Sequence, residues 1–176
     1  MPVPMFLRDR SQRSLYWEGW LSTTLLRDLP RMFKRGFDSE FALRILEQLG
    51  QILREGELPT TAHFNVRRNR KLKTYLQAFE AIFVLKKVSP HDFGTGKDIW
   101  YLCDSGLAAH LMKTVTGEGA SLSLARHFLL NELSALLEIY EGIHSITYYK
   151  STRGSPKSEK ALGAGMKRHF WARRRI

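Results

Sequence analysis

The stretch from Thr60 to Asp104 constrains the fold most, because it contains one strongly periodic helix with a turn before it and an extended run after it. Its apolar residues recur at i, i+3, i+4 and i+7, which places them on one helical face: Leu72, Tyr75, Leu76, Phe79, Ile82 and Phe83. We expect Ser89-Pro90 to end the helix, since the residue before a proline disfavours α geometry. Residues 98–102 are then extended. The stretch therefore predicts a short helix opened by Thr60, a turn, a long helix and a β-ribbon.

This order is the layout of a winged helix-turn-helix module. A dense group of Lys and Arg lies on or just before the long helix, on the face opposite the apolar stripe, and such a cluster is typical of nucleic-acid binding. An ordinary solvated helix face is the alternative interpretation. The predicted nucleic-acid-binding residues are those on the helix and before it, with one on the ribbon: Arg67, Arg68, Arg70, Lys73, Thr74, Gln77 and Lys97.

Charge is spread unevenly along the 176 residues, whose formal net charge is +11. Residues 150–176 carry nine Lys/Arg and one acid, a net of +8, so the remainder carries +3. Hydrophobic residues at 43% and charged residues at 26% are typical of a globular protein. A single cysteine, Cys103, excludes an intrachain disulfide and favours a cytoplasmic location. No apolar run approaches the ~18 residues of a membrane span, so we expect no membrane association.

Two helices are expected before this stretch. The first begins near Ser14, has Trp17 and Trp20 as packing residues and ends before Gly36. Asp38 or Ser39 caps the second, whose buried stripe has helical spacing: Ala42, Ile45, Leu46, Leu49, Ile52 and Leu53.

Further elements follow the ribbon. Asp104-Ser105 caps a helix over residues 106–113, and residues 123–140 form an amphipathic helix. The predicted buried side of that amphipathic helix is Leu124, Phe128, Leu129, Leu133, Leu136 and Leu137. Residues 143–149 alternate like a strand, whereas residues 155–176 show no period and are expected to be disordered or a loosely attached helix. We expect a helical, winged-helix domain over 1–116, a partial α/β segment over 117–154 and a basic tail over 155–176.

Four segments together resemble a known family, the domain of unknown function found carboxy-terminal to the ATPase module of many prokaryotic AAA+ superfamily ATPases. They are residues 17–28 (WEGWLSTTLLRD), 75–90 (YLQAFEAIFVLKKVSP), 97–107 (KDIWYLCDSGL), and Asn131-Glu132-Leu133 followed by 146–154. The resemblance covers about residues 13 to 155. It implies a mostly α fold with a small β component, in which a winged helix precedes a truncated endonuclease-like α/β part.

The chain departs from that family at the residues that would carry chemistry. It has no Gly-x-x-x-x-Gly-Lys-Ser/Thr phosphate loop, so we expect no ATPase activity and no bound cofactor. An endonuclease-like site needs several acids around Mg²⁺, and Glu132 lacks partners on a credible second strand. No pair of histidines has the i, i+4 spacing of a helical metal site. We therefore expect no catalytic and no metal-binding residue.

The sequence favours a non-catalytic winged-helix module that binds double-stranded DNA or has a regulatory role. The alternative is a docking or scaffold fragment, which would pair with an ATPase domain or with another copy of itself through the helix of Trp17 and Trp20. Winged helices serve both purposes, so the fold alone does not decide between them.

Overall fold

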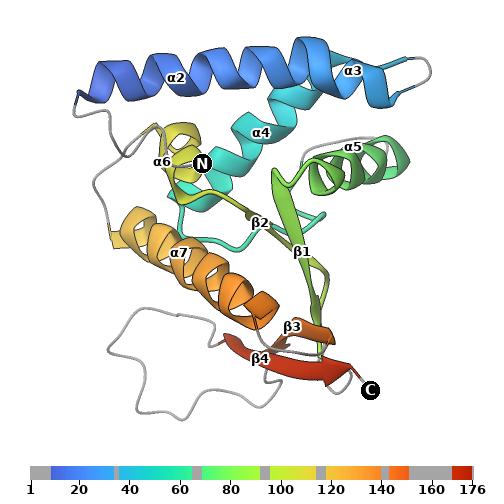
Figure 1. Cartoon of the computed structure of the whole chain (residues 1–176), viewed down its shortest axis with the longest axis vertical. Helices are drawn as coiled ribbons and strands as arrows, with labels where there is room; N and C mark the ends of the chain where they lie inside the picture. The colour runs from blue at the N-terminus through green and yellow to red at the C-terminus, as the bar shows by residue number, and fades with distance from the viewer. Residues whose placement is uncertain are drawn as a thin grey trace.

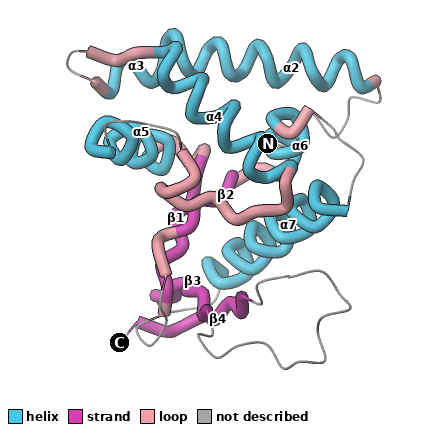
Figure 2. Tube along the Cα trace, turned by 180° about the vertical axis from the view of Figure 1, so that it is seen from behind, coloured by secondary structure: helices cyan, strands magenta, loops and turns pink. Residues whose placement is uncertain are grey.

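The structure is a computed structural model that describes residues 9–33, 36–64, 69–91, 96–113, 118–139, 143–150 and 168–175. It is mostly helical with one small sheet, which confirms the predicted balance of helix and strand. Helix α2 runs across one end of the molecule, and strands β3 and β4 lie at the other (Figure 1). Helices α5 and α7 lie on opposite sides of the β1–β2 ribbon, and the view from behind agrees (Figure 2).

The helical elements in chain order are α2 (Arg10–Thr23), the π-helical turn η1 (Thr24–Asp28), α3 (Leu29–Met32), α4 (Ser39–Arg54), α5 (Asn69–Ala81), α6 (Ser105–Leu111) and α7 (Glu118–Ile139). The strands are β1 (Leu85–Pro90), β2 (Ile99–Leu102), β3 (Ile143–Lys150) and β4 (Arg168–Arg175). Their order in the sheet is β2-β1-β3-β4. β1 is antiparallel to β2 and parallel to β3, and β4 pairs antiparallel with β3.

Helix α4 is the centre of the helical part. Asp38 caps it as predicted, because its Oδ1 accepts a hydrogen bond of 2.9 Å from the backbone N–H of Phe41. Every residue of the predicted stripe is buried. The buried side of α4 faces η1, α6 and α7, so one amphipathic helix holds three other elements together.

The first helix is nearly continuous from α2 through α3. Within η1, the N–H of Leu29 donates to the carbonyl of Thr24, five residues back instead of four, which inserts one turn of π-helix. Trp17 is buried and packs edge-on against Tyr16 and Trp20. The packing role predicted for Trp17 is confirmed.

The long helix α5 ends at Ala81, and the prediction that it continues to Ser89-Pro90 is wrong. Phe83 has φ 58°, in the left-handed region, and its N–H donates to the carbonyl of Glu80 (3.1 Å). The N–H of Val84 donates to the carbonyl of Phe79 (2.9 Å). These two bonds form a Schellman motif, which ends a helix, with Phe in the place that glycine usually takes. The chain then continues as β1.

The predicted short helix opened by Thr60 is also absent from the described residues, which stop at Phe64 and resume at Asn69. Thr60 forms a β-bridge with Ile99, and the N–H of Trp100 donates to the carbonyl of Pro59 at 2.9 Å. Because its backbone pairs with β2, Thr60 is extended, and only one turn follows it, over residues 61–63. Thr60 thus pairs with a strand distant in the sequence instead of capping the predicted helix.

The β1–β2 ribbon is covered on both faces. Leu85 lies opposite Leu102, and both belong to the larger apolar cluster, which the helices form. Val88 lies opposite Ile99 and belongs to a smaller cluster, in which Tyr101, Leu58, Tyr148 of β3 and Leu130 of α7 are also buried. Since side chains alternate between the faces of a strand, this short ribbon joins the two clusters.

The buried side of α7 differs from the predicted one. It consists of Ala120, Ser123, His127 and Leu130, whereas four of the six residues predicted to be buried are exposed: Phe128, Leu129, Leu133 and Leu136. The hydroxyl of Ser123 donates to the carbonyl of Leu53 at 2.7 Å, which satisfies that polar group inside the core. The helix is apolar on several faces, so its spacing alone could not show which one packs against α4.

The prediction of disorder or a loose helix for residues 155–176 is wrong for Arg168–Arg175, which form strand β4. Eight residue pairs join β4 to β3, from Ile143 with Arg175 to Lys150 with Arg168. The partner strand lies more than a dozen residues earlier in the sequence, and a strand at a sheet edge needs little apolar periodicity of its own. Residues 151–167 lie outside the described residues.

Two glycines provide a matched test of helix packing. A Cβ on Gly50 of α4 would meet the backbone of Leu111, whose carbonyl carbon lies 2.7 Å from that position, whereas a Cβ on Gly19 of α2 would have no neighbour within 4 Å. We expect Gly50→Ala to lower the free energy of unfolding by about 1–3 kcal/mol, because backbone cannot yield as a side chain can. Gly19→Ala should raise it by about 0.5–1 kcal/mol. Urea unfolding measures both, and equal effects would contradict the close α4–α6 crossing.

His127 provides a test at low pH. Burial lowers its pKa below the usual 6.5, the hydrogen bond to the carbonyl of Ser123 opposes this shift, and Arg126 adds to it. The unfolded chain therefore takes up this proton first as the pH falls below 6.5. We expect the contribution of His127 to the free energy of unfolding to be constant above pH 6.5 and to decrease below it. The decrease is at most about 1.4 kcal/mol per pH unit for this one group.

The measurement is the free energy of unfolding of the protein and of His127→Leu between about pH 5.5 and 8. The variant lacks the titrating ring, so its stability should depend less on pH in this range. Parallel curves for the two proteins would show that His127 does not contribute.

Candidate nucleic-acid interface

The outward face of α5 carries the predicted polar residues together. Arg70, Lys73, Thr74 and Gln77 are all exposed, while the stripe on the opposite side, Leu72, Tyr75, Leu76 and Phe79, is buried. The hydroxyl of Thr74 donates to the carbonyl of Arg70 at 3.1 Å, which holds that side chain along the helix. The only acid in the α5 sequence is Glu80, in its last turn. The result is a helix of about 20 Å with two cations and two neutral hydrogen-bonding groups on its free face.

Lys71 belongs to the same basic run but has a structural role. Its Nζ lies 2.9 Å from Oδ2 of Asp38 and 4.3 Å from the centroid of the Phe41 ring. The hydroxyl of Tyr75 in turn accepts from the N–H of Asp38 at 2.6 Å. The N–H of Phe41 and, next, the Lys71 ammonium lower the pKa of Asp38. These contacts attach the start of α4 to α5 and fix the orientation of the exposed face.

The remaining predicted residues are not gathered on this face. Lys97 is exposed, but it precedes β2 at the end of the ribbon where Val88 pairs with Ile99, away from the end that adjoins α5. Its carbonyl accepts a hydrogen bond of 2.7 Å from the hydroxyl of Tyr148. Arg67 and Arg68 lie outside the described residues.

Sequence reasoning missed Lys87, which is exposed on β1. It lies opposite Trp100 and on the same side of the ribbon as Leu85, which packs in the cluster that includes α5. Lys87 was missed because the long helix was predicted to include residues 85–90. A helix directs a different set of side chains outward from the one that a strand exposes. The β-branched residues Val84 and Val88, which flank Leu85-Lys86-Lys87, were the available signal for a strand.

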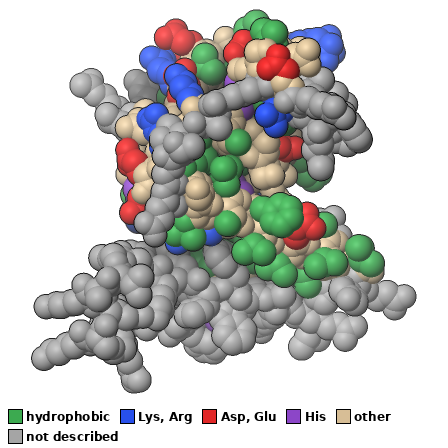
Figure 3. Space-filling model, turned by 90° about the vertical axis from the view of Figure 1, so that its left-hand side faces the viewer, with side chains coloured by type: hydrophobic (Ala, Val, Ile, Leu, Met, Phe, Trp, Pro, Cys, Tyr) green, Lys and Arg blue, Asp and Glu red, His purple; other side chains and the backbone are tan. Residues whose placement is uncertain are grey.

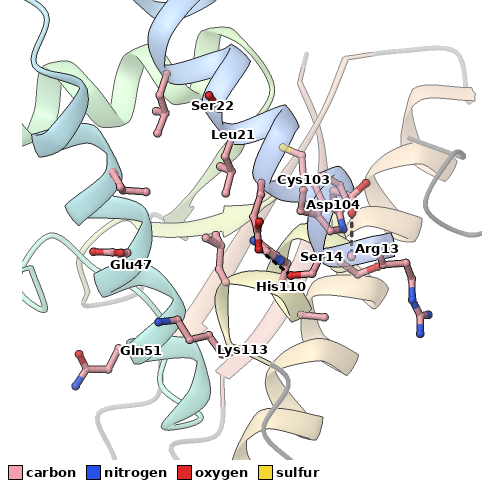
Figure 4. Close-up of a pocket in the computed structure, with 18 of the residues that line it drawn as sticks. Arg13, Ser14, Leu21, Ser22, Glu47, Gln51, Cys103, Asp104, His110 and Lys113 are labelled. Carbon is pink, nitrogen blue, oxygen red and sulfur yellow. Dashed lines mark hydrogen bonds between the residues drawn. The ribbon is translucent and has the colours of Figure 1, made fainter. Parts of the chain in front are cut away.

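A second surface lies apart from α5. It is a groove of about 1820 Å³ between α2, α4, α6 and α7. Side chains from three of these elements point toward a common space in Figure 4, among them Leu21, Glu47 and His110. Hydrophobic side chains also gather over α7 on one face of the molecule (Figure 3), where Phe128, Leu129 and others on this helix are exposed.

A thiol and several carboxylates line the groove, and side chains of these kinds can carry chemistry. Burial raises the pKa of the Cys103 thiol to about 11, so it is a poor nucleophile at neutral pH. Asp104 caps α6 as predicted, since its Oδ1 accepts from the N–H groups of Gly106 (2.7 Å) and Leu107 (3.0 Å). Glu132 is exposed on α7. Within the described ranges, no three His, Cys, Asp or Glu residues come together as metal ligands would.

No helix in the described part of the chain is long and apolar enough to cross a membrane. The sequence matches no protein-family model, and neither the curated proteins nor the solved structures yield a match to it.

Proposed function

We propose that this chain is a non-catalytic winged-helix module that binds double-stranded DNA through α5. The observation that carries the proposal is the outward face of this helix, where Arg70, Lys73, Thr74 and Gln77 are exposed together. Arg and Lys neutralise phosphates, and the same side chains with Thr and Gln recognise base edges in the major groove. An α-helix with its side chains, about 10–12 Å in diameter, fits the major groove, which is about 12 Å wide.

The arrangement around α5 supports the winged-helix interpretation. Helix α4, the Thr60–Ile99 bridge, α5 and the antiparallel β1–β2 ribbon follow one another along the chain in an order compatible with such a module. The short helix that would precede α5 is absent from the described residues. Lys87 and Lys97 then belong to the wing, where they would contact phosphates beside the groove that α5 enters. The family relationship to the carboxy-terminal half of AAA+ ATPases is likewise a proposal, which rests on the four sequence segments.

Replacing Arg70 and Lys73 together by Glu tests the α5 face. The change removes two cations and adds two anions without touching the buried stripe, so stability should change by only ~0.5 kcal/mol per site. Affinity for a nonspecific duplex should fall strongly. In the milder variants Arg70→Ala and Lys73→Ala, the slope of log K against log salt should fall by about one unit for each lost phosphate contact. Fluorescence anisotropy with a labelled duplex, across a series of salt concentrations, measures both quantities.

The matched control is Arg13→Glu combined with Arg31→Glu, in the full-length protein. It lowers the formal net charge of +11 by the same four units, but on α2 and α3. This control accounts for the basic residues 150–176, which could bind any polyanion. Equal losses of affinity in the two double variants would mean that net charge, and not the α5 face, holds the duplex.

Docking of a protein partner is the second candidate function. It is favoured by the exposed apolar side chains around the groove and on α7, because contiguous apolar surface on a protein often marks an interaction site. The two functions use different surfaces, since none of Arg70, Lys73, Thr74 and Gln77 lines the groove.

A further inference from the structure

The size of the groove between α2, α4, α6 and α7 separates two classes of occupant. Small-molecule pockets usually enclose about 300–1,000 Å³, whereas this open groove has a volume of about 1820 Å³. A helix of about 14 residues and 10 Å diameter occupies about 1,600 Å³. The groove therefore suits a segment of secondary structure better than a metabolite.

Exposed apolar side chains line the groove from three elements. Leu26 of η1 is 66% exposed, Phe128 of α7 is 54% exposed and Leu43 of α4 is 38% exposed. Leu21 and Leu25 also line the groove, but they are buried and belong to the larger apolar cluster. An apolar stripe on a partner would cover the exposed side chains and continue that core.

On two walls of the groove an acidic side chain lies about one helical turn from one of these apolar side chains. Leu43 and Glu47 are four residues apart on α4, as are Phe128 and Glu132 on α7, so each pair shares one helical face. Glu18 supplies an exposed carboxylate from α2. Five Asp/Glu and three Lys/Arg line the groove, whereas the whole chain has 17 Asp/Glu and 28 Lys/Arg. The groove is thus an acidic site on a basic protein.

We propose that this groove binds an amphipathic helix of a protein partner, in which an apolar stripe is flanked by Lys and Arg. The stripe contacts Leu26, Leu43 and Phe128, and the cations face Glu18, Glu47 and Glu132. The paired apolar and acidic side chains on α4 and α7, with the excess of acids over cations in the lining, favour such a helix over an acidic one. The proposal is independent of DNA binding, which uses the opposite charge on α5.

The probe is a labelled synthetic peptide of about 18 residues, five helical turns, made of Leu and Lys with the Leu residues on one face. Its binding to the full-length protein is followed by fluorescence anisotropy at low salt. Two control peptides accompany it: one with Glu in place of every Lys, and one with the same composition scrambled so that no apolar face forms. We expect only the amphipathic Leu/Lys peptide to bind.

Leu26→Ala and Leu15→Ala form a matched pair of variants. Both leucines are 66% exposed on the first helix, but only Leu26 lines the groove. We expect Leu26→Ala to weaken binding of the peptide about ten-fold, because its side chain is covered in the complex, and Leu15→Ala to leave binding unchanged. Glu18→Gln combined with Glu47→Gln should weaken binding about five-fold at low salt and less at ~0.5 M salt.

Three results would overturn the proposal. The scrambled or the Glu-containing peptide could bind as tightly as the amphipathic Leu/Lys peptide, or Leu15→Ala could weaken binding as much as Leu26→Ala. Sedimentation of the protein alone could also reveal a dimer that Leu26→Ala abolishes, in which case a second copy fills the groove. The double variant Arg70→Glu with Lys73→Glu should bind the peptide normally, so a failure here is distinguishable from a failure of the DNA-binding proposal.

Discussion

The two-sided burial of the β1–β2 ribbon is the constraint on which the rest of the structure depends. Its Leu85–Leu102 face completes the core of α2, α4 and α5, and its Val88–Ile99 face packs against α7 and β3. Only two residue pairs join β1 to β3 in the described chain, so the buried side chains on this second face add to the contact between the ribbon and β3. Thr60 adds a bridge to the same ribbon from the segment before α5. The ribbon thus helps to orient α5, together with the contacts of Lys71 and Tyr75 with the start of α4, and to position α7, together with α4.

The ribbon also keeps two surfaces of opposite character apart. Helix α5, with its exposed cations, lies on one side, and α7, which forms a wall of the acidic groove, lies on the other (Figures 1 and 2). A single net charge of +11 hides this division. Because exposed charges interact weakly beyond about 10 Å at moderate ionic strength, the basic face and the acidic groove can attract different partners at the same time. A protein that joins DNA to a second protein would need this separation.

The features that could be predicted are those set by residues close to one another in the sequence. The caps Asp38 and Asp104, the stripe of α4 and the free face of α5 were all predicted from residues within one or two helical turns. The end of α5 was not, because the left-handed residue is Phe83 instead of a glycine. The packing face of α7 could not be predicted either, because a helix with apolar residues on several sides packs where its partners allow. The groove arises from four separate elements, so no single stretch of sequence shows it.

The π-helical turn in the first helix has a consequence for chains related to this one. Its extra residue is absorbed between Thr24 and Asp28, so that Trp17 before it and Leu29 after it both face the core. Such turns accommodate one inserted residue inside an otherwise regular helix. A homologue with one residue fewer here could form an uninterrupted α-helix and keep both side chains inward. A sequence alignment that forbids gaps within helices would then misplace everything on one side of this turn.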